Sequence, residues 1–103
     1  MQEIFIKAVT APDDSRDIMH YETYYYGENK IFSSLKDAEK YLMKKLDKEI
    51  KKQVKRLETD YFYSSMREIH NNALLICVRN KAYIKRQIDK IKEDLRRKSL
   101  WYL

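Results

Sequence analysis

Only two residues of this chain, Pro12 and Gly27, strongly interrupt regular structure, and both lie in its first third. No glycine or proline follows Gly27. The rest of the chain can therefore form long uninterrupted elements, and apolar residues recur there at spacings of three and four. That period is typical of amphipathic helices, so the pattern after Gly27 predicts a few long helices.

The segment before residue 35 has the composition of strands joined by turns. Residues 3–9 and 18–26 are rich in β-branched and aromatic side chains, which favour strands. Residues 10–17 contain Pro12 and several aspartates and predict a loop between the two strands. Alternation along the first strand places three apolar residues on one face: Ile4, Ile6 and Ala8.

A reversal and a short third strand are expected next. Residues 27–30 predict a turn in which Gly27 and Asn29 are the candidates for a positive φ angle. Residues 31–32 predict a short third strand. Residues 1–34 should therefore form an antiparallel meander of two or three strands.

The first predicted helix spans residues 35–58. Ser34 offers an N-cap, and Asp37 follows three residues later, as in a capping box. The apolar stripe of this helix consists of Leu35, Ala38, Leu42, Leu46, Ile50, Val54 and Leu57.

Residues 59–72 predict a connector, irregular or with a short helix, because the asparagines at 71 and 72 tolerate the left-handed conformation that ends helices. A second helix is expected over residues 73–98. Its first part, residues 73–78, is also compatible with a buried strand. Residues 99–103 are largely apolar, and we expect them to fold back onto the core. Apolar residues with a coiled-coil period of 3.5 occur in the second helix at Ile84, Ile88, Ile91 and Leu95.

These elements predict an α+β fold in a single domain, residues 1–103, with one long helix across a small sheet and a second helix packed on the first. The longest apolar run has six residues, against about 18 for a membrane-spanning helix. The N-terminal residues lack the apolar stretch of a secretory signal. Cys77 is the only cysteine, so no internal disulfide can form. We therefore expect a cytoplasmic protein that does not enter membranes.

Catalytic patterns in the sequence are weak. Residues 12–13 and 28–30 have the written form of a Mg²⁺-dependent PD-(D/E)xK nuclease motif, but that motif needs its Glu and Lys along a central strand, whereas here they lie in a predicted turn. His20, His70 and Cys77 lack the spacing of a zinc site. A single glycine cannot make a glycine-rich phosphate loop. The sequence thus predicts a protein that is not an enzyme, with no catalytic residues, no metal and no cofactor.

Charge is distributed unevenly along the chain. The formal net charge is +6, of which residues 1–34 contribute −3 and residues 59–72 contribute −1. Residues 35–58 contribute +4 and residues 73–103 contribute +6. The positive charge therefore lies on the two predicted helices, which favours an anionic partner for them.

Two sets of cations are candidates for contact with that partner. On a helical wheel, four lysines of the first helix fall within about 60° of one another, opposite its apolar stripe. They are Lys44, Lys48, Lys51 and Lys55. The second helix adds Lys85, Arg86, Lys92, Arg96 and Arg97. Such residues either bind phosphates or acidic side chains, or are solvated residues that favour helix formation and solubility.

Tyrosines cluster on the predicted second strand, where alternation places Tyr24 and Tyr26 on one face and Tyr21 and Tyr25 on the other. If helices cover one face only, Tyr24 and Tyr26 stay exposed and can anchor a protein partner or stack on bases. If both faces are covered, all four tyrosines belong to the core.

The leading hypothesis is a small binding protein, without enzymatic activity, that occupies the surface of a protein partner. Its size and its composition rich in lysine, isoleucine and tyrosine are typical of phage or mobile-element accessory proteins. We expect an inhibitor of a host or defence component, with anti-CRISPR activity as one form. The alternative is direct nucleic-acid binding through the basic faces of the helices. A homodimer through the apolar seam of the second helix is a third arrangement.

Overall fold

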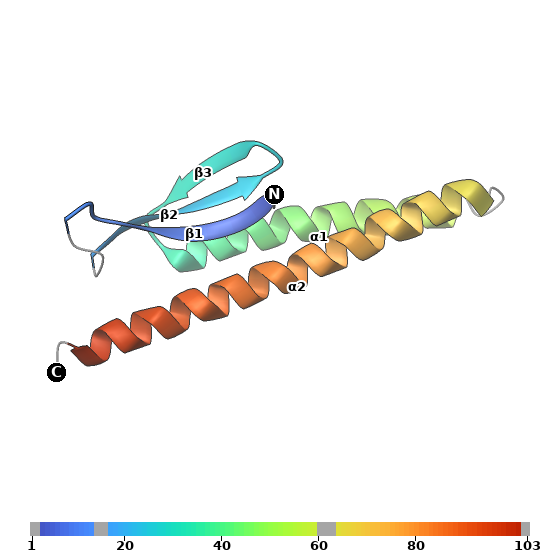
Figure 1. Cartoon of the computed structure of the whole chain (residues 1–103). Coiled ribbons are helices and arrows are strands. Elements are labelled where there is room, and N and C mark those ends of the chain that lie inside the picture. Colours follow the sequence, from blue (N-terminus) through green and yellow to red (C-terminus); the bar gives the residue numbers. More distant parts are fainter. Residues whose placement is uncertain (1–2, 14–16, 60–63, 102–103) are drawn as a thin grey trace.

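A computed structural model describes residues 3–13, 17–59 and 64–101 of the chain. A three-stranded antiparallel sheet is followed by two long helices, which confirms the predicted α+β class (Figure 1). The helices run side by side in opposite directions, and the sheet lies on one side of them. The elements in chain order are β1 (Ile4–Thr10), β2 (Ile18–Tyr25), β3 (Glu28–Phe32), α1 (Leu35–Thr59) and α2 (Ser64–Trp101).

A two-residue turn joins β2 to β3, with Tyr25 paired to Glu28 across it. Tyr26 has a φ angle of 46° and Gly27 has one of 86°. Two successive positive φ angles are typical of a type I′ turn, whose twist matches that of the strands. The positive φ predicted for Gly27 is confirmed. The one predicted for Asn29 is wrong, because Tyr26 takes the first turn position and β3 already begins at Glu28.

The start of α1 is confirmed at its predicted residue. The Asp37 backbone N–H donates to Ser34 Oγ at 3.4 Å, and the Ala38 N–H donates to the Ser34 carbonyl at 3.1 Å. The Ser34 side chain therefore satisfies one of the backbone donors that a helix leaves free at its N-terminus, and its carbonyl accepts the first bond of the helix itself. The helix ends at Thr59, one residue beyond the prediction.

The bounds of α2 correct two predictions and confirm a third. The helix begins at Ser64, so most of the connector predicted over residues 59–72 is helical. Residues 73–78 belong to the helix, as expected, and the alternative of a buried strand is wrong. The asparagines at 71 and 72 do not break it, because an exposed asparagine costs a helix well under about 1 kcal/mol and no glycine or proline supports a stop there. The prediction that the tail folds back onto the core is wrong for residues 99–101, because the helix continues to Trp101. Residues 102–103 lie outside the described part.

The core lies between the sheet and the helix pair. Its buried residues come from every layer, and α2 contributes Ile84 and Ile88 from the predicted seam. The first half of that seam packs inside the chain, whereas Ile91 and Leu95 remain partly exposed. The buried cluster consists of Ile4, Ile6, Tyr21, Ala38, Leu42, Leu46, Ile84 and Ile88.

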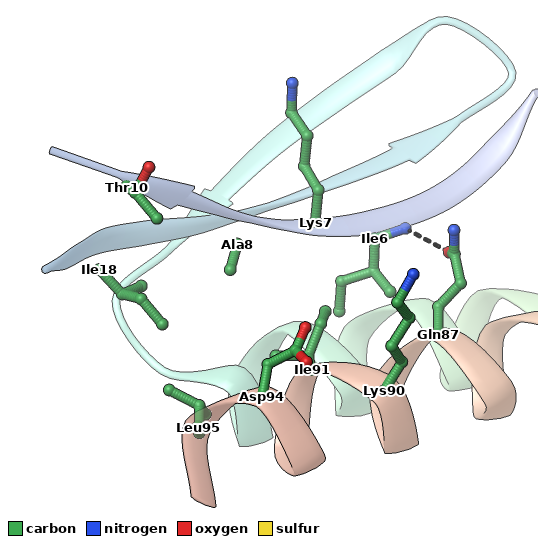
Figure 2. Close-up of a pocket in the computed structure, with 10 residues that line it drawn as sticks. All are labelled: Ile6, Lys7, Ala8, Thr10, Ile18, Gln87, Lys90, Ile91, Asp94 and Leu95. Atoms are coloured by element: carbon green, nitrogen blue, oxygen red, sulfur yellow. Dashed lines mark hydrogen bonds between the residues drawn. The ribbon is translucent and has the colours of Figure 1, made fainter. Parts of the chain in front are cut away.

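Each helix supports a different part of the sheet. α2 packs along β1, and α1 packs under β2 and β3, so the second helix contacts the sheet as well as the first helix. At the outer edge of β1 the Ile6 N–H donates to Gln87 Oε1 at 3.0 Å (Figure 2). Gln87 Nε2 in turn donates to the Tyr83 hydroxyl at 2.9 Å. α2 therefore satisfies a backbone donor at this edge of the sheet.

Candidate functional site

Lysines gather along the side of α1 that faces away from α2. Two tyrosines, Tyr25 and Tyr41, and the carboxylate of Glu49 join them in lining a groove of about 620 Å³. Lys51 and Lys55 are exposed on the same side of α1 but do not line it. We call this feature the lysine groove; its lysines are Lys44, Lys45, Lys48 and Lys52.

Lys45 is held at the base of the lysine groove by an ion pair. Its Nζ lies 3.0 Å from Glu28 Oε2, and the Tyr41 hydroxyl donates to the other carboxylate oxygen of Glu28. The same Nζ lies 5.5 Å from the centre of the Tyr25 ring and 5.3 Å from that of Tyr41. The hydrogen bonds from Tyr41 and Lys45 lower the pKa of Glu28, and the bond to Glu28 raises the pKa of Lys45. Lys45 therefore positions the two rings and its charge is compensated.

The other lysines of the groove keep their charge for a ligand. Within the described part of the chain, Lys44, Lys48 and Lys52 have no ion pair with a carboxylate. The carboxylate of Glu49 accepts a hydrogen bond from Gln53 Nε2 at 3.0 Å. Burial, followed by the charge of Glu49, raises the pKa of Tyr25, so its hydroxyl stays protonated as a donor. The lysine groove thus offers three cations and two aromatic rings to an anionic ligand.

The basic residues of α2 do not extend this surface. Lys92 lies 3.9 Å from Glu39, and Arg97 lies 2.8 Å from Glu93. By helical spacing, Lys85, Lys92 and Arg96 lie within about 40° of one another on α2, and Arg86 and Arg97 form a second row about 100–120° further around the helix. The five predicted residues, all exposed and none of them in the lining of the lysine groove, are Lys85, Arg86, Lys92, Arg96 and Arg97.

The predicted tyrosine pair does not share a face. Tyr24 lies on the outer face of the sheet, stacked on Phe5 with ring centres 4.3 Å apart. Tyr26 lies in the turn, where alternation no longer applies, and its ring meets the Tyr25 ring edge-on at 4.9 Å. The sequence reasoning missed Tyr25 and Tyr41 as site residues. The signal was the helical spacing of four between Tyr41 and Lys45, which puts them on the same side of α1.

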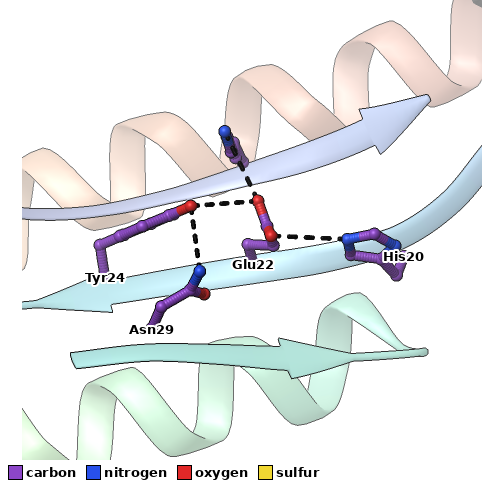
Figure 3. A network of polar contacts seen from close by, with 5 residues as sticks. His20, Glu22, Tyr24 and Asn29 are labelled. Carbon is purple, nitrogen blue, oxygen red and sulfur yellow. Dashed lines mark hydrogen bonds and ion pairs between the residues drawn. The ribbon is translucent and has the colours of Figure 1, made fainter. Parts of the chain in front are cut away.

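A polar network around Glu22 occupies the outer face of the sheet (Figure 3). Lys7 Nζ lies 3.5 Å from the Glu22 carboxylate and His20 Nε2 lies 3.6 Å from it. The Tyr24 hydroxyl donates to Glu22 at 3.3 Å and accepts from Asn29 Nδ2 at 3.2 Å. Burial alone raises the pKa of Glu22, but the charge of Lys7 and these bonds outweigh it, and the pKa lies below its ordinary value. The polar groups of this network therefore satisfy one another.

A second, smaller groove of about 300 Å³ lies between β1 and the C-terminal half of α2 (Figure 2). Its lining is mainly apolar, with Ile6, Ile91 and Leu95 among the residues that surround it. Lys90 and Asp94 lie at its rim. Their charges oppose each other, so this groove has no net preference for an anion or a cation.

The residues of the nuclease-like pattern are not brought together. Residues 12–13 precede the start of β2, whereas Glu28 and Lys30 follow its end, so the two halves lie at opposite ends of the sheet (Figure 1). Glu28 is engaged by Tyr41 and Lys45.

The two histidines and the cysteine each lie in a different local environment. His20 contacts Glu22, and His70 Nδ1 lies 3.2 Å from Gln53 Oε1. Cys77 is buried, and burial followed by the charge of Glu49 raises the pKa of its thiol. No group of three potential metal ligands occurs in the described residues. In the same part of the chain no helix is long and apolar enough to cross a membrane.

The helix pair runs past the sheet at one end (Figure 1), and apolar side chains of both helices are exposed. Among residues 73–78, the longest apolar run, three side chains are about half exposed. The exposed apolar residues of the two helices are Val54, Ile69, Leu75, Ile76 and Val78.

Comparisons with known proteins add no relative. No protein-family model, no curated protein and no solved structure matches this chain.

Proposed function

We propose that this protein is a binding protein, without enzymatic activity, that docks on an acidic surface of a partner protein through the lysine groove. The observation that carries the proposal is the set of uncompensated cations Lys44, Lys48 and Lys52 beside the rings of Tyr25 and Tyr41. Lysines steer an acidic partner and fix its orientation, and partly buried tyrosines are frequent anchors of protein interfaces.

An acidic protein fits this surface better than a duplex nucleic acid does. Duplex binding draws on many cations spread over a broad face, but cations of α2 are paired with acids and none of them lines the lysine groove. The lysine groove is confined to α1 and the end of β2, and its aromatic rings lie against Lys45. A groove of this kind suits a short acidic segment.

A second candidate, single-stranded nucleic acid, is supported by the linear density of charge on α1. Besides the ion-paired Lys45, five lysines occur between residues 44 and 55. At 1.5 Å per residue they span about 16 Å, or about 3–4 Å per charge, close to the spacing of about 3.4 Å along one nucleic-acid strand. This candidate predicts that the affinity falls with salt at a log–log slope of several.

One form of this proposal is an inhibitor that covers the surface of a host or defence protein. The size and composition of the chain favour an origin in a phage or mobile element. We also place its action in the cytoplasm, since Cys77 can form no internal disulfide.

The test is capture from bacterial lysate with the tagged full chain, with and without nuclease, read by mass spectrometry. A triple charge reversal, Lys44→Glu with Lys48→Glu and Lys52→Glu, should abolish retention of one acidic protein that survives nuclease treatment. The matched control makes the same change in charge on α2 and should retain the partner; its substitutions are Lys85→Glu, Arg86→Glu and Arg96→Glu. Equal capture by both variants would overturn the proposal. Loss of all captured material after nuclease would favour the nucleic-acid candidate.

A further inference from the structure

The two edges of the sheet differ in the partners of their outward-facing backbone groups. At the β1 edge, α2 supplies Gln87 to satisfy the Ile6 N–H (Figure 2). The strand order is β1-β2-β3, and within the described residues no element pairs with the outer edge of β3. An unpaired edge presents a row of backbone donors and acceptors that can accept another strand. β3 is therefore the open side of the sheet.

The backbone groups at this edge can be assigned from the hydrogen-bond alternation. The Tyr26 N–H donates to the Glu3 carbonyl, and the Ile6 N–H points to α2, so even-numbered residues of β2 bond to β1. Odd-numbered residues of β2 then bond to β3, where their partners are the even-numbered residues. The N–H and C=O groups of Asn29 and Ile31 consequently face the open edge.

The side chains of β3 also indicate a missing neighbour. Ile31 is 64% exposed on the outer face, where its cross-strand partner Glu22 covers it from one side only. Native edge strands are often protected by a bulge or a proline, but the pairing of β3 with β2 is regular throughout and proline is absent from it. An added strand would place a side chain directly beside Ile31.

The lysine groove lies below this same edge. Tyr41 of α1 contacts Phe32 with ring centres 5.3 Å apart and donates to Glu28, so α1 runs directly beneath β3. On the helical wheel Lys48 and Lys44 lie about 60° and 100° around α1 from Lys45, further from the buried stripe than Lys45 does. They therefore project on the outer side of β3. A strand added at about 4.8 Å from β3 would direct alternate side chains toward them.

We propose that the acidic partner binds as an extended segment that adds to the open edge of β3 as a fourth strand. Its inward side chains are acidic and meet Lys44 and Lys48, and its outward side chains are apolar and cover Ile31. This inference rests on the proposed function of the lysine groove and specifies the form of the ligand. A second copy of the chain fits the edge less well, because pairing two β3 strands brings two sets of α1 lysines, each on a chain of net charge +6, close together.

The test uses the full chain and an eleven-residue capped peptide of alternating glutamate and valine, in its L form and its D form. The two peptides have the same charge and composition, but only the L form can continue a right-twisted sheet of L residues. We expect the L peptide to bind at least about tenfold more tightly than the D peptide. This factor corresponds to the loss of one or more hydrogen bonds and of side-chain packing in the D form. Hydrogen exchange should show added protection at residues 28–32 with the L peptide only.

Two variants separate the strand pairing from the charge. Ile31→Pro removes an edge donor and should weaken the L peptide about tenfold while leaving the D peptide unchanged. Lys44→Glu with Lys48→Glu should weaken both peptides. Far-ultraviolet circular dichroism checks that each variant is folded, and the comparison of enantiomers on the unaltered chain needs no variant at all.

Several outcomes would overturn the strand addition. Equal affinity for the two enantiomers would show binding by charge alone, which leaves the proposed function of the lysine groove standing. Absence of binding by the L peptide, or protection outside β3, would refute the inference directly. Protection of β3 that rises with protein concentration without peptide would show that a second copy takes the edge. Failure of the proposed function itself is read separately, from the lysate capture with the charge-reversed groove.

Discussion

Two isoleucines of α2 provide a matched test of where the core ends. Ile84 is fully buried, with 0% of its surface exposed, whereas Ile76, two turns earlier on the same helix, is 52% exposed. Replacing each by alanine removes the same atoms from the same secondary structure. The free energies of unfolding of the two variants should therefore differ only through burial.

The magnitude follows from the atoms removed. An isoleucine loses three carbons on truncation to alanine, worth about 2.4 kcal/mol at about 0.8 kcal/mol each, and a cavity adds to this in a packed core. We expect Ile84→Ala to cost about 3–4 kcal/mol. Ile76→Ala should cost about 1 kcal/mol or less, because half of its surface is already in water and alanine is the better helix former.

Urea unfolding followed by circular dichroism measures the difference. At an m-value of about 2 kcal/mol/M, the two midpoints should lie about 1–1.5 M apart with unchanged slopes. Equal costs would refute the reasoning, since residues 73–78 would then be as buried as the core. A cost of Ile76→Ala that rises with protein concentration would mean that another copy covers this segment.

Three further changes test other parts of the structure. Glu28→Gln should lower stability at neutral pH: the folded pKa of Glu28 is depressed, so its contribution is present above about pH 4.3, the usual unfolded value. The difference in melting temperature between the variant and the parent chain should vanish as the pH falls through the lowered folded pKa, and a difference constant down to strong acid would contradict this. Ser34→Ala removes the N-cap of α1 and should cost about 1 kcal/mol by urea unfolding, with Ser33→Ala as the neutral control. In Gly27→Ala the added Cβ meets no atom within 4 Å, but the residue keeps a φ of 86°. The substitution should therefore lower the free energy of unfolding by about 1–2 kcal/mol in the same urea experiment. An unchanged stability would show that the turn changes type.

The sequence was sufficient for the elements whose signals are local. The alternation of Ile4 and Ile6, the Ser34 cap and the apolar stripe of α1 each depend on neighbours within a few residues. The structure confirms them, except that Val54 of the predicted stripe is exposed. The asparagines at 71 and 72 failed as a stop signal because their weak local preference competes with a continuous apolar face that α1 supports. Tyr25 and Tyr41 could not be assigned to one groove from the sequence. They come together because Tyr25 pairs with Glu28 across the hairpin and Glu28 accepts the hydrogen bond of Tyr41.

The exposure of residues 73–78 has a geometric cause. An apolar run of this length is typical of a buried segment, yet three of its side chains are about half exposed. The eight residues of β2, the longest strand, reach about 26 Å at about 3.3 Å each. The 38 residues of α2 reach about 57 Å at 1.5 Å each, in agreement with a rod 62 Å long. The sheet can cover only about half of the helix pair.

Chain connectivity explains why the open edge and the lysine groove occur together. Only residues 33–34 separate β3 from α1, which is too short a link for the chain to cross the sheet, so α1 must lie beneath the last strand. α2 returns antiparallel to α1 and fills the remaining space under β1, where Gln87 satisfies the Ile6 N–H at that edge. Among the described residues no later element covers the edge of β3, and the helix beneath it carries the lysines. In this chain order the strand that a partner can extend and the cations that an acidic partner needs are therefore placed on the same side of the molecule.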